Sequence, residues 1–380
     1  MINRKKYNWS ELGVSAEVSS FSPEGSIAEH HAILHVEPRG DVFTKQYERI
    51  LSGEELLFNV PELKNAKVVF KRYFLSDATN QAPLMMPQDN SCAISFIQQS
   101  PLDGSKLALW VYLQEGTEIS CEDNTTIVRH NGYTDLWTMG IYSNKDNSYM
   151  QTWKTLFSYI DILKKHNATL LDNCIRTWFF VRDVDTQYDG LVKARRECFL
   201  EQGLTPKTHY IASTGIGGNP ADPKALVQLG AYAMTGFEPE QQHYLYALDH
   251  LNKTIEYGVT FERGTLFEYG DRAHVYISGT ASINEKGEVI HVGDIVKQTE
   301  RMWENVEALL KEGKMSYDDV VQIIVYLRDT ADYDVVSRLF AEKFPDMPYV
   351  ITLAPVCRPT WLVEMECIAI QSRQTGYRKF

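Results

Sequence analysis

The clearest pattern of hydrophobic and polar positions lies in the last third of the chain. A short apolar stretch at residues 274–279 predicts a strand, and the continuous β-branched run at residues 320–327 is typical of a strand buried on both faces. Between them, four apolar residues recur at the spacing of one helix face: Met302, Val306, Leu309 and Leu310. A second helix at 332–344 and two strands at 349–355 and 361–370 complete an α+β unit.

The first third of the chain repeats this pattern in a degenerate form. Gln46 falls on Gln298 at an offset of 252 residues, with matching Lys-Gln and Glu-Arg pairs around both. The same offset, without a gap, places Asp77 on Asp329. We expect the second helix of this copy to be cut short around residues 82–88, where two prolines interrupt it.

The middle third repeats the pattern once more. Gln151 falls on Gln298 at an offset of 147, and Arg182 falls on Arg328 at an offset of 146. Chance recurrence of strands and helices is the alternative, but self-similarity at a fixed spacing favours duplication. The sequence therefore predicts three units, at residues 1–115, 116–240 and 241–380.

Each predicted unit is a mixed β-sheet with two helices packed on one face, so the fold class is α+β. The other face of each sheet is left uncovered, and it becomes buried if the three sheets pack against one another. We therefore expect one chain to form an intramolecular pseudo-trimer. The whole molecule is then either a monomer or a homo-oligomer that associates through these units.

The composition limits the classes of function. The formal net charge of −12 argues against general nucleic-acid binding, which requires clustered lysine and arginine. The sequence contains no apolar run of membrane-spanning length, and residues 1–9 lack the apolar core of a secretion signal. The six cysteines show neither a C-x-x-C pair nor a zinc-binding spacing, so we expect reduced thiols in a cytoplasmic protein. No metal site is expected, since His31 and His35 share a strand face but lie too far apart.

Glu364 is the strongest candidate for chemistry. It lies between apolar neighbours in the last predicted strand, where the repeat places Gln228 in the second unit and Leu109 in the first. The fold therefore does not require an acid at this position. Burial raises the pKa of a carboxyl and leaves it partly protonated near neutral pH, as a general acid requires. A structural salt bridge is the alternative role, and Glu366 on the same strand face is the rival candidate.

The last third also carries a set of motifs that occur together in one family: Ile277-Ser278-Gly279, Gly293-Asp294 followed by Gln298, Asn305, residues 325–329 (VYLRD) and residues 362–366 (LVEME). This region resembles the RidA/YjgF superfamily, also described as the L-PSP endoribonuclease family. Simple members are homotrimers with clefts between their subunits. The resemblance implies three RidA-like (chorismate-mutase-like) units and a small-molecule site in a cleft between two of them.

One position departs from the simple RidA-type enamine/imine deaminases. Those enzymes bind a substrate carboxylate with an arginine on the strand that precedes the last one. The position falls near Val350 in the third unit, near residues 209–210 in the second and near residues 90–91 in the first. None of these residues is arginine.

A second resemblance, to the chorismatases, rests on residues 212–218 (ASTGIGG), residues 278–283 (SGTASI), residues 291–294 (HVGD), Cys357 ahead of Glu364, and Arg176, Tyr188 and Arg195 in the middle segment. Chorismatases are a larger, fused branch of the same superfamily that hydrolyses chorismate to pyruvate and a cyclohexadiene or benzoate product. Asp189 and Val192 stand in a segment that normally carries a further arginine and asparagine.

This resemblance implies a site without a metal or cofactor, in which Glu364 is the general acid. Protonation of an enol-ether methylene carbon gives an oxocarbenium ion, which water captures. Substrate carboxylates call for guanidinium groups, which bind them bidentately, although each single arginine has a structural role as its alternative. The candidate substrate-binding residues are Arg263, Arg176, Arg195, Tyr188, Ser213, Thr214, Gly215, Cys357 and Arg358.

Three functions remain open from the sequence. The first is a hydrolase or lyase of a small anionic enol-ether or imine metabolite, and the second is an enamine/imine deaminase of the RidA type. The third is a non-catalytic protein that binds a small carboxylate in decayed sites. RNA cleavage follows from the family description alone, and the acidic net charge argues against it.

Overall fold

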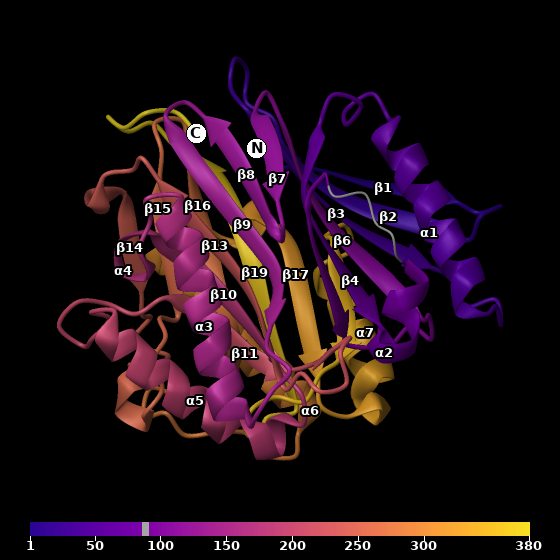
Figure 1. Ribbon diagram of the computed structural model, residues 1–380. Coiled ribbons are helices and arrows are strands. Elements are labelled where there is room, and N and C mark those ends of the chain that lie inside the picture. The colour runs from indigo at the N-terminus through magenta and orange to yellow at the C-terminus, as the bar shows by residue number, and fades with distance from the viewer. Residues whose placement is uncertain (86–90) are drawn as a thin grey trace.

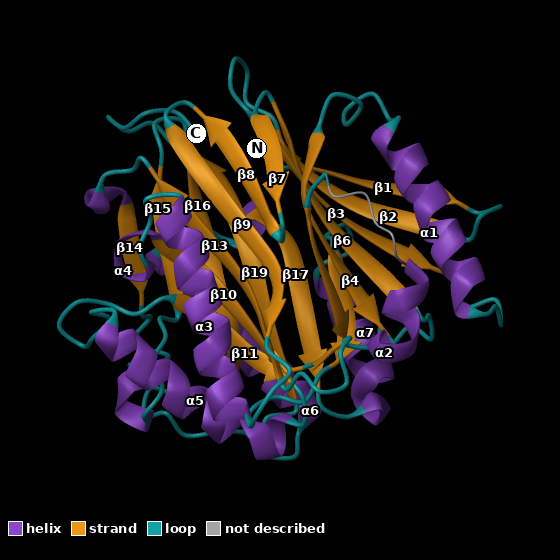
Figure 2. Cartoon of the chain, in the orientation of Figure 1, coloured by secondary structure: helices purple, strands orange, loops and turns teal. Residues whose placement is uncertain are grey.

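The computed structural model describes residues 1–85 and 91–380. Three β-sheets follow one another along the chain, and the strands gather at the centre with helices on the outside (Figures 1 and 2). In each sheet one pair of neighbouring strands is parallel, and the remaining pairs among the main strands are antiparallel. The predicted fold class, α+β with tandem mixed sheets in a pseudo-trimer, is confirmed.

The first sheet has the order β1-β2-β3-β6-β4-β5-β12. Its strands are β1 (Asn3–Trp9), β2 (Val14–Phe21), β3 (Ala28–Val36), β4 (Lys67–Leu75), β5 (Ala93–Gln98), β6 (Leu107–Glu115) and the short β12 (Asn219–Pro220). Helix α1 (Phe43–Phe58) packs on it, and the second helix is reduced to α2 (Ala78–Gln81) and the 3-10 turn η1 (Ala82–Met85). This agrees with a shortened second helix, although Pro87 lies outside the described residues.

The second sheet has the order β11-β10-β13-β9-β8-β7. Its strands are β7 (Glu118–Glu122), β8 (Thr125–His130), β9 (Tyr133–Tyr142), β10 (Cys174–Val181), β11 (Ala212–Gly217) and β13 (Val227–Thr235). Its helices are α3 (Ser148–Lys165), α4 (Leu170–Asn173) and α5 (Val184–Glu201). Helix α3 begins where the Asn147 side chain accepts a hydrogen bond from the Met150 N–H, a common way for a helix to start.

The third sheet has the order β14-β15-β16-β19-β17-β18. Its strands are β14 (Gln242–Leu245), β15 (Gly264–Glu268), β16 (Arg272–Ala281), β17 (Val320–Leu327), β18 (Tyr349–Leu353) and β19 (Val363–Ser372). Helices α6 (Ile295–Glu312) and α7 (Tyr333–Lys343) cover its outer face. The predicted periodicity of α6 agrees with the structure, since Met302, Val306, Leu309 and Leu310 are all buried.

One glutamine in each unit fixes the start of the closing strand. In every case the side-chain oxygen accepts a hydrogen bond from the backbone N–H of the residue just before that strand. The pairs are Gln46 with Lys106 at 2.8 Å, Gln151 with Leu226 at 2.7 Å, and Gln298 with Leu362 at 2.9 Å. The three units therefore share this contact as well as their topology, which supports the predicted duplication.

The same contacts correct one residue assignment. Counting from Lys106, Leu226 and Leu362, the positions equivalent to Glu364 are Gln228 and Ala108, not Leu109. Strand pairing agrees, because Ala108 lies opposite Phe74 as Glu364 lies opposite Tyr326. The alignment of the first closing strand was displaced by one residue, which moves a side chain to the other face of the sheet.

The inner sheet faces form one continuous core. Trp137 of the second unit stacks on Tyr232 at 4.1 Å between ring centroids and packs against Phe70 of the first unit at 5.1 Å. Tyr232 in turn contacts Tyr276 of the third unit at 5.5 Å. Large aromatic surfaces therefore close the ring of three sheets, and burial of such surface is the main favourable term in folding.

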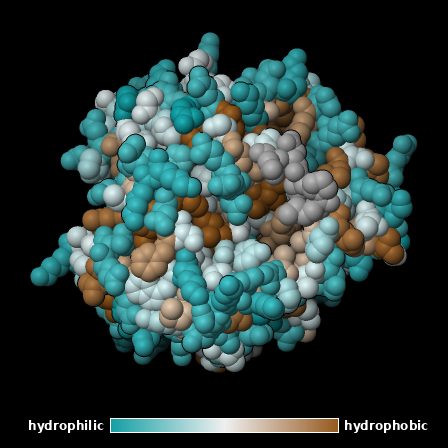
Figure 3. Space-filling view, in the orientation of Figure 1, coloured by the Kyte–Doolittle hydropathy of each residue, from teal (hydrophilic) through white to brown (hydrophobic). Residues whose placement is uncertain are grey.

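The outer surface has a different character from this core. The face seen in Figure 3 is largely hydrophilic, with hydrophobic residues in small separate patches. In the described part of the chain, no helix combines the length and the apolar composition needed to cross a membrane.

Candidate active site

A cavity of about 330 Å³ lies where the second and third units meet. One wall comes from α5 and β11, and the other from β16, β19 and the segments that lead into β15 and β19. Eight predicted site residues line it: Tyr188, Arg195, Ser213, Gly215, Arg263, Cys357, Arg358 and Glu364. The topology thus brings together residues that are far apart in the sequence.

Glu364 is the buried acid of this cavity. It is the second residue of β19, lies opposite Ala281 of β16, and is 5 % exposed. Burial raises its pKa, and the negative charge of Glu366 raises it further. The positive charges of Arg263 and Arg176 offset only part of this effect, so the pKa of Glu364 is about 8. The carboxyl is therefore largely protonated at neutral pH.

Gly279 makes room for this carboxyl. A Cβ atom at position 279 would overlap the carboxyl group of Glu364. The backbone N–H of Gly279 donates a hydrogen bond to the Thr214 hydroxyl at 2.9 Å, which ties β16 to β11 across the boundary between the units. The wall next to Glu364 therefore depends on a residue without a side chain, held by the neighbouring unit.

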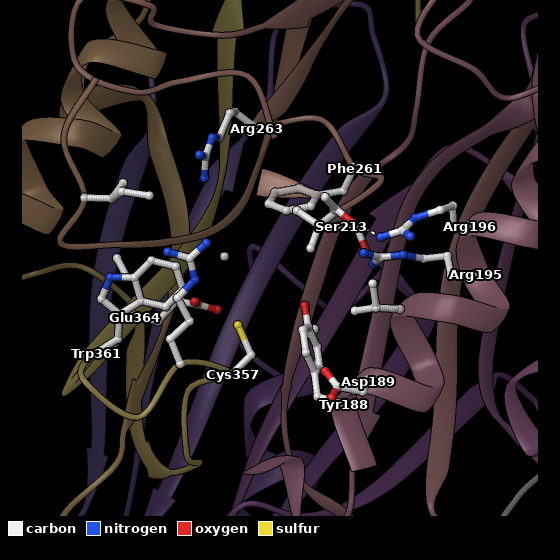
Figure 4. A pocket seen from close by; sticks show the side chains of 18 residues that line it. Tyr188, Asp189, Arg195, Arg196, Ser213, Phe261, Arg263, Cys357, Trp361 and Glu364 are labelled. Atoms are coloured by element: carbon white, nitrogen blue, oxygen red, sulfur yellow. Dashed lines mark hydrogen bonds between the residues drawn. The ribbon is translucent and has the colours of Figure 1, made fainter. Parts of the chain in front are cut away.

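Two arginines of the third unit, Arg263 and Arg358, line the cavity, and Figure 4 shows Arg263 on the same side as Glu364. Arg263 is buried, and Asn252 accepts its hydrogen bonds at 3.1 to 3.3 Å. Arg358 lies over the ring of Trp361 at 4.7 Å. Both guanidinium groups are positioned by these contacts, and a fixed guanidinium is well suited to bind a carboxylate.

Two further arginines lie on the opposite side, where Figure 4 shows Arg195 and Arg196 projecting from α5. Arg195 is buried and lies 5.7 Å above the Phe179 ring, whereas Arg196 is exposed and donates to the Gly258 carbonyl. The cavity therefore has cationic groups at both ends.

Tyr188 and Cys357 lie between these two ends (Figure 4). The Tyr188 hydroxyl and the Cys357 thiol share a hydrogen bond, and burial raises the pKa of Cys357 to about 12. A thiol with so high a pKa is a poor nucleophile, so Cys357 forms part of the wall.

Arg176 and Thr214 do not line this cavity, which corrects their predicted placement. Arg176 donates to Glu366 at 2.9 Å and to the Thr214 hydroxyl at 2.5 Å, and all three side chains are buried behind the wall. An arginine with a buried carboxylate partner in another unit cannot be recognised from local sequence, because that partner lies 190 residues away.

Several lining residues were not found as site residues from the sequence. They are Asp189, Val192, Arg196, Phe261 and Trp361. Asp189 and Val192 appeared only as departures from the chorismatase pattern, and both face the cavity. Phe261 belongs to the segment between β14 and β15 of the third unit, where no periodicity predicts the direction of a side chain.

The other two clefts between units lack an acid at the position of Glu364. In the cleft between the first and second units, Gln228 donates across the boundary to the Ser95 hydroxyl at 3.1 Å. In the cleft between the third and first units, the equivalent position is Ala108, opposite His35. His35 lies there between Glu17, at 3.1 Å, and Asp103, at 3.6 Å. The first of these clefts is bridged by the Gln228 contact, whereas the second holds a smaller cavity of about 240 Å³.

The strand register also shows which residue of each unit stands at the arginine position of the simple deaminases. Val350 pairs with Ile324 in the third sheet, and the equivalent pairs are Thr214 with Trp178 and Ser95 with Arg72. The predicted positions 209–210 and 90–91 were therefore displaced, and residue 90 lies outside the described residues. None of Val350, Thr214 and Ser95 is arginine, so the departure from the simple deaminases remains.

Metal ligation has no support in residues 1–85 and 91–380, where no three histidine, cysteine, aspartate or glutamate side chains are grouped as a metal site. None of the six cysteines forms a disulfide bond within the described residues.

Comparison with known proteins places the third unit in a family. Residues 270–371 match the family model described as Endoribonuclease L-PSP. The 3-aminoacrylate deaminase RutC of Acinetobacter baylyi is 34 % identical over 98 residues, which are 25 % of this chain and 77 % of that protein. The chain belongs to the RidA superfamily. A RutC family protein of Pyrococcus abyssi is 36 % identical over 98 residues, 25 % of this chain and 76 % of its own length.

Most of the architecture also matches a protein of known structure. A crystal structure of chorismatase superposes with a TM-score of 0.64 and 18 % sequence identity, covering 82 % of this chain and 96 % of that chain. The two proteins share their fold. This RidA-superfamily chain therefore contains three units where a simple member has one.

Proposed function

We propose that this protein is a cofactor-independent hydrolase or lyase that acts on a small anionic enol ether or imine, with Glu364 as the general acid. The observation that carries the proposal is a buried carboxyl with a pKa of about 8, facing a cavity with arginines at both ends. A general acid works best when its pKa lies near the operating pH. The fold shared with chorismatase supports the same chemistry.

The proposed reaction of an enol ether begins with proton transfer. The Glu364 carboxyl gives its proton to the methylene carbon of the enolpyruvyl group, and the resulting cation is stabilised by the ether oxygen. Water adds to the cationic carbon and loses a proton, which returns to the Glu364 carboxylate. The hemiketal that forms collapses to pyruvate and an alcohol, so no redox partner or cofactor is required.

The arginines have a separate role in this proposal. Arg263 and Arg358 bind the carboxylate next to the reacting carbon, and Arg195 binds an anionic group at the far end. Between them, Phe261, Trp361 and Val192 provide an apolar wall. Exclusion of water from this wall strengthens each electrostatic interaction and keeps Glu364 protonated until substrate is bound.

The direct test is to incubate the purified protein with chorismate and to follow the release of pyruvate. We expect turnover that the Glu364→Gln variant reduces by at least about 100-fold, since general acids contribute roughly that much or more. The Gln228→Ala variant is the matched control, because Gln228 occupies the equivalent position in another cleft. Equal rates in the wild-type protein and the Glu364→Gln variant would contradict the proposal.

Deamination is the second candidate, since the matched RutC relative is named a 3-aminoacrylate deaminase. The same buried acid could protonate the carbon of an enamine, and water would then release ammonia from the imine. Ammonia release from 2-aminoacrylate or 3-aminoacrylate, without pyruvate release from chorismate, would favour this function. Saturable binding of small carboxylates without any turnover would favour a binding protein instead.

A further inference from the structure

Glu366 lies two residues after Glu364 on the same face of β19, where side chains from all three units meet. Its Oε2 atom accepts hydrogen bonds from Arg176 at 2.9 Å and from the Thr214 hydroxyl, and its Oε1 atom accepts one from the Trp178 indole at 2.7 Å. The guanidinium of Arg72, from the first unit, lies 3.9 Å from Oε1. Glu366 is 2 % exposed.

These contacts pair Glu366 with cations of the other two units. Both of its oxygens accept hydrogen bonds, and two guanidinium groups face it. Glu366 does not line the cavity, so it cannot reach a substrate there.

The equivalent positions show that the fold does not require this carboxylate. Two residues beyond Ala108 and Gln228 stand Trp110 and Gly230. Both are compatible with the central core, where Trp110 packs edge-on against Phe70 at 4.7 Å. Only the unit that carries Glu364 therefore has a second carboxylate next to it.

We propose that Glu366 is a positioning residue, whose fixed negative charge, supplied with partners by the other two units, keeps the neighbouring Glu364 carboxyl protonated and ready to act. This inference rests on the proposed function of Glu364. A like charge nearby disfavours ionisation of a second carboxyl, and the effect is strong where water is excluded. The direction agrees with the pKa of Glu364, which burial raises first and Glu366 raises further.

Hydrogen bonds in the cavity wall also link Glu366 to the residue beside the Glu364 carboxyl. The Thr214 hydroxyl, which donates to Glu366, accepts the hydrogen bond of the Gly279 backbone N–H. Gly279 is the residue that leaves space for the Glu364 carboxyl. Glu366 therefore fixes the position of the acid as well as its protonation.

Other charged and titratable groups also surround Glu364 or line the same cavity. They are Arg176 from β10, Tyr326 from β17, Tyr188 and Arg195 from α5, Arg263 ahead of β15, and Cys357 and Arg358 ahead of β19. Arg263 and Arg176 favour the ionised form of Glu364, so Glu366 is the carboxylate that opposes them.

The test is a pH titration of the Glu364 carboxyl in the full-length protein. The infrared absorption of the protonated carboxyl is measured at each pH, and the spectrum of the Glu364→Gln variant is subtracted. We expect Glu366→Gln to lower the titration midpoint by about one pH unit or more, a tenfold or larger change in proton affinity. If the enzyme turns over substrate, the loss of kcat at high pH should move to lower pH by the same amount. An unchanged midpoint would overturn the inference.

Two further variants separate charge from structure. Trp178→Phe removes one hydrogen bond to Glu366 but leaves its charge, so we expect the midpoint of Glu364 not to fall. Glu366→Gln combined with Arg72→Met removes opposite charges together and allows folding if the single variant is unstable. This double variant should still lower the titration midpoint of Glu364. A midpoint equal to that of the wild-type protein would again contradict the inference.

The two proposals can fail separately. If no substrate is turned over but Glu366→Gln lowers the midpoint, the coupling between the carboxyls stands and the proposed reaction fails. If turnover depends on Glu364 while the midpoint is insensitive to residue 366, the reaction stands and the role of Glu366 is wrong.

Discussion

At the scale of single residues, burial disfavours the charged form of the Glu364 carboxyl, and the proposed reaction uses the protonated form. Its folded pKa of about 8 lies above the ordinary value of 4.5, so the folded state holds this proton more tightly than the unfolded chain does. Stability contributed by the protonated form is therefore present below the unfolded pKa and is lost as pH rises toward about 8.

This predicts a pH-dependent effect of Glu364→Gln on stability. The variant should be about as stable as the wild-type protein near pH 4.5 and more stable at pH 9, by about 5 kcal/mol at most. Denaturant unfolding at the two pH values measures the difference. A variant that is less stable at pH 9 would mean that the carboxylate is well accommodated in the fold.

Gly279 gives a second prediction at the residue scale. Gly279→Ala places a methyl group against the Glu364 carboxyl, so we expect turnover to fall at least about tenfold. Gly376→Ala is the matched control, since a Cβ atom there would meet no other atom within 4 Å. Comparable rates for the two variants would show that the carboxyl is free to move.

At the scale of elements, three closing strands are held in the same way. Gln298→Ala leaves the Leu362 N–H without its acceptor and should destabilise the protein by about 1–3 kcal/mol. Gln46→Ala removes the equivalent contact in the first unit and should have a similar effect on stability. Only Gln298→Ala should lower kcat for the folded molecules, because β19 carries the acid. Equal kcat values would contradict the assignment of the active cleft.

The cleft between the third and first units predicts another pH dependence. Burial opposes the charge of His35, but hydrogen bonds to Asp103 and Glu17 outweigh it and raise its pKa to about 10. Stability from this histidine is therefore complete below its unfolded pKa of 6.5 and is lost between about pH 6.5 and 10. His35→Ala should be less stable than the wild-type protein at pH 6, and the difference should shrink by pH 10.5. Thermal unfolding at the two pH values checks this.

Much of each element could be predicted from the sequence, and the exceptions have physical reasons. The run at residues 320–327 is β17 itself, since an unbroken apolar strand is buried on both faces. The assignment of Leu109 was wrong by one residue because a strand pattern alone does not fix its register. Arg176 was misplaced because its carboxylate partner lies in another unit, and Phe261 was missed because a linking segment has no period.

At the scale of the whole molecule, the ring closes through aromatic contacts between units. Trp137 contacts both Phe70 and Tyr232, so its truncation affects more than one unit. Trp137→Ala should cost about 3–5 kcal/mol. We expect the three units still to unfold together, as one calorimetric transition at a lower temperature. Separate transitions for the units would show that they fold independently.

The fused arrangement makes the three clefts between units different from one another. In a symmetric trimer three clefts are equivalent, whereas here the acid position holds Glu364, Gln228 and Ala108. Gln228 bridges one of the other two clefts, the second holds a cavity of about 240 Å³, and the third holds the cavity of about 330 Å³ that Glu364 lines. The domain boundaries at residues 115 and 240 stay predictions.

The central claim is that one buried carboxyl in one cleft serves as a proton donor. The most direct measurement is the pH titration of Glu364 in the wild-type protein, taken as the infrared difference from Glu364→Gln. The account predicts a midpoint near pH 8. A midpoint at or below about pH 5, the range of an ordinary glutamate, would contradict it.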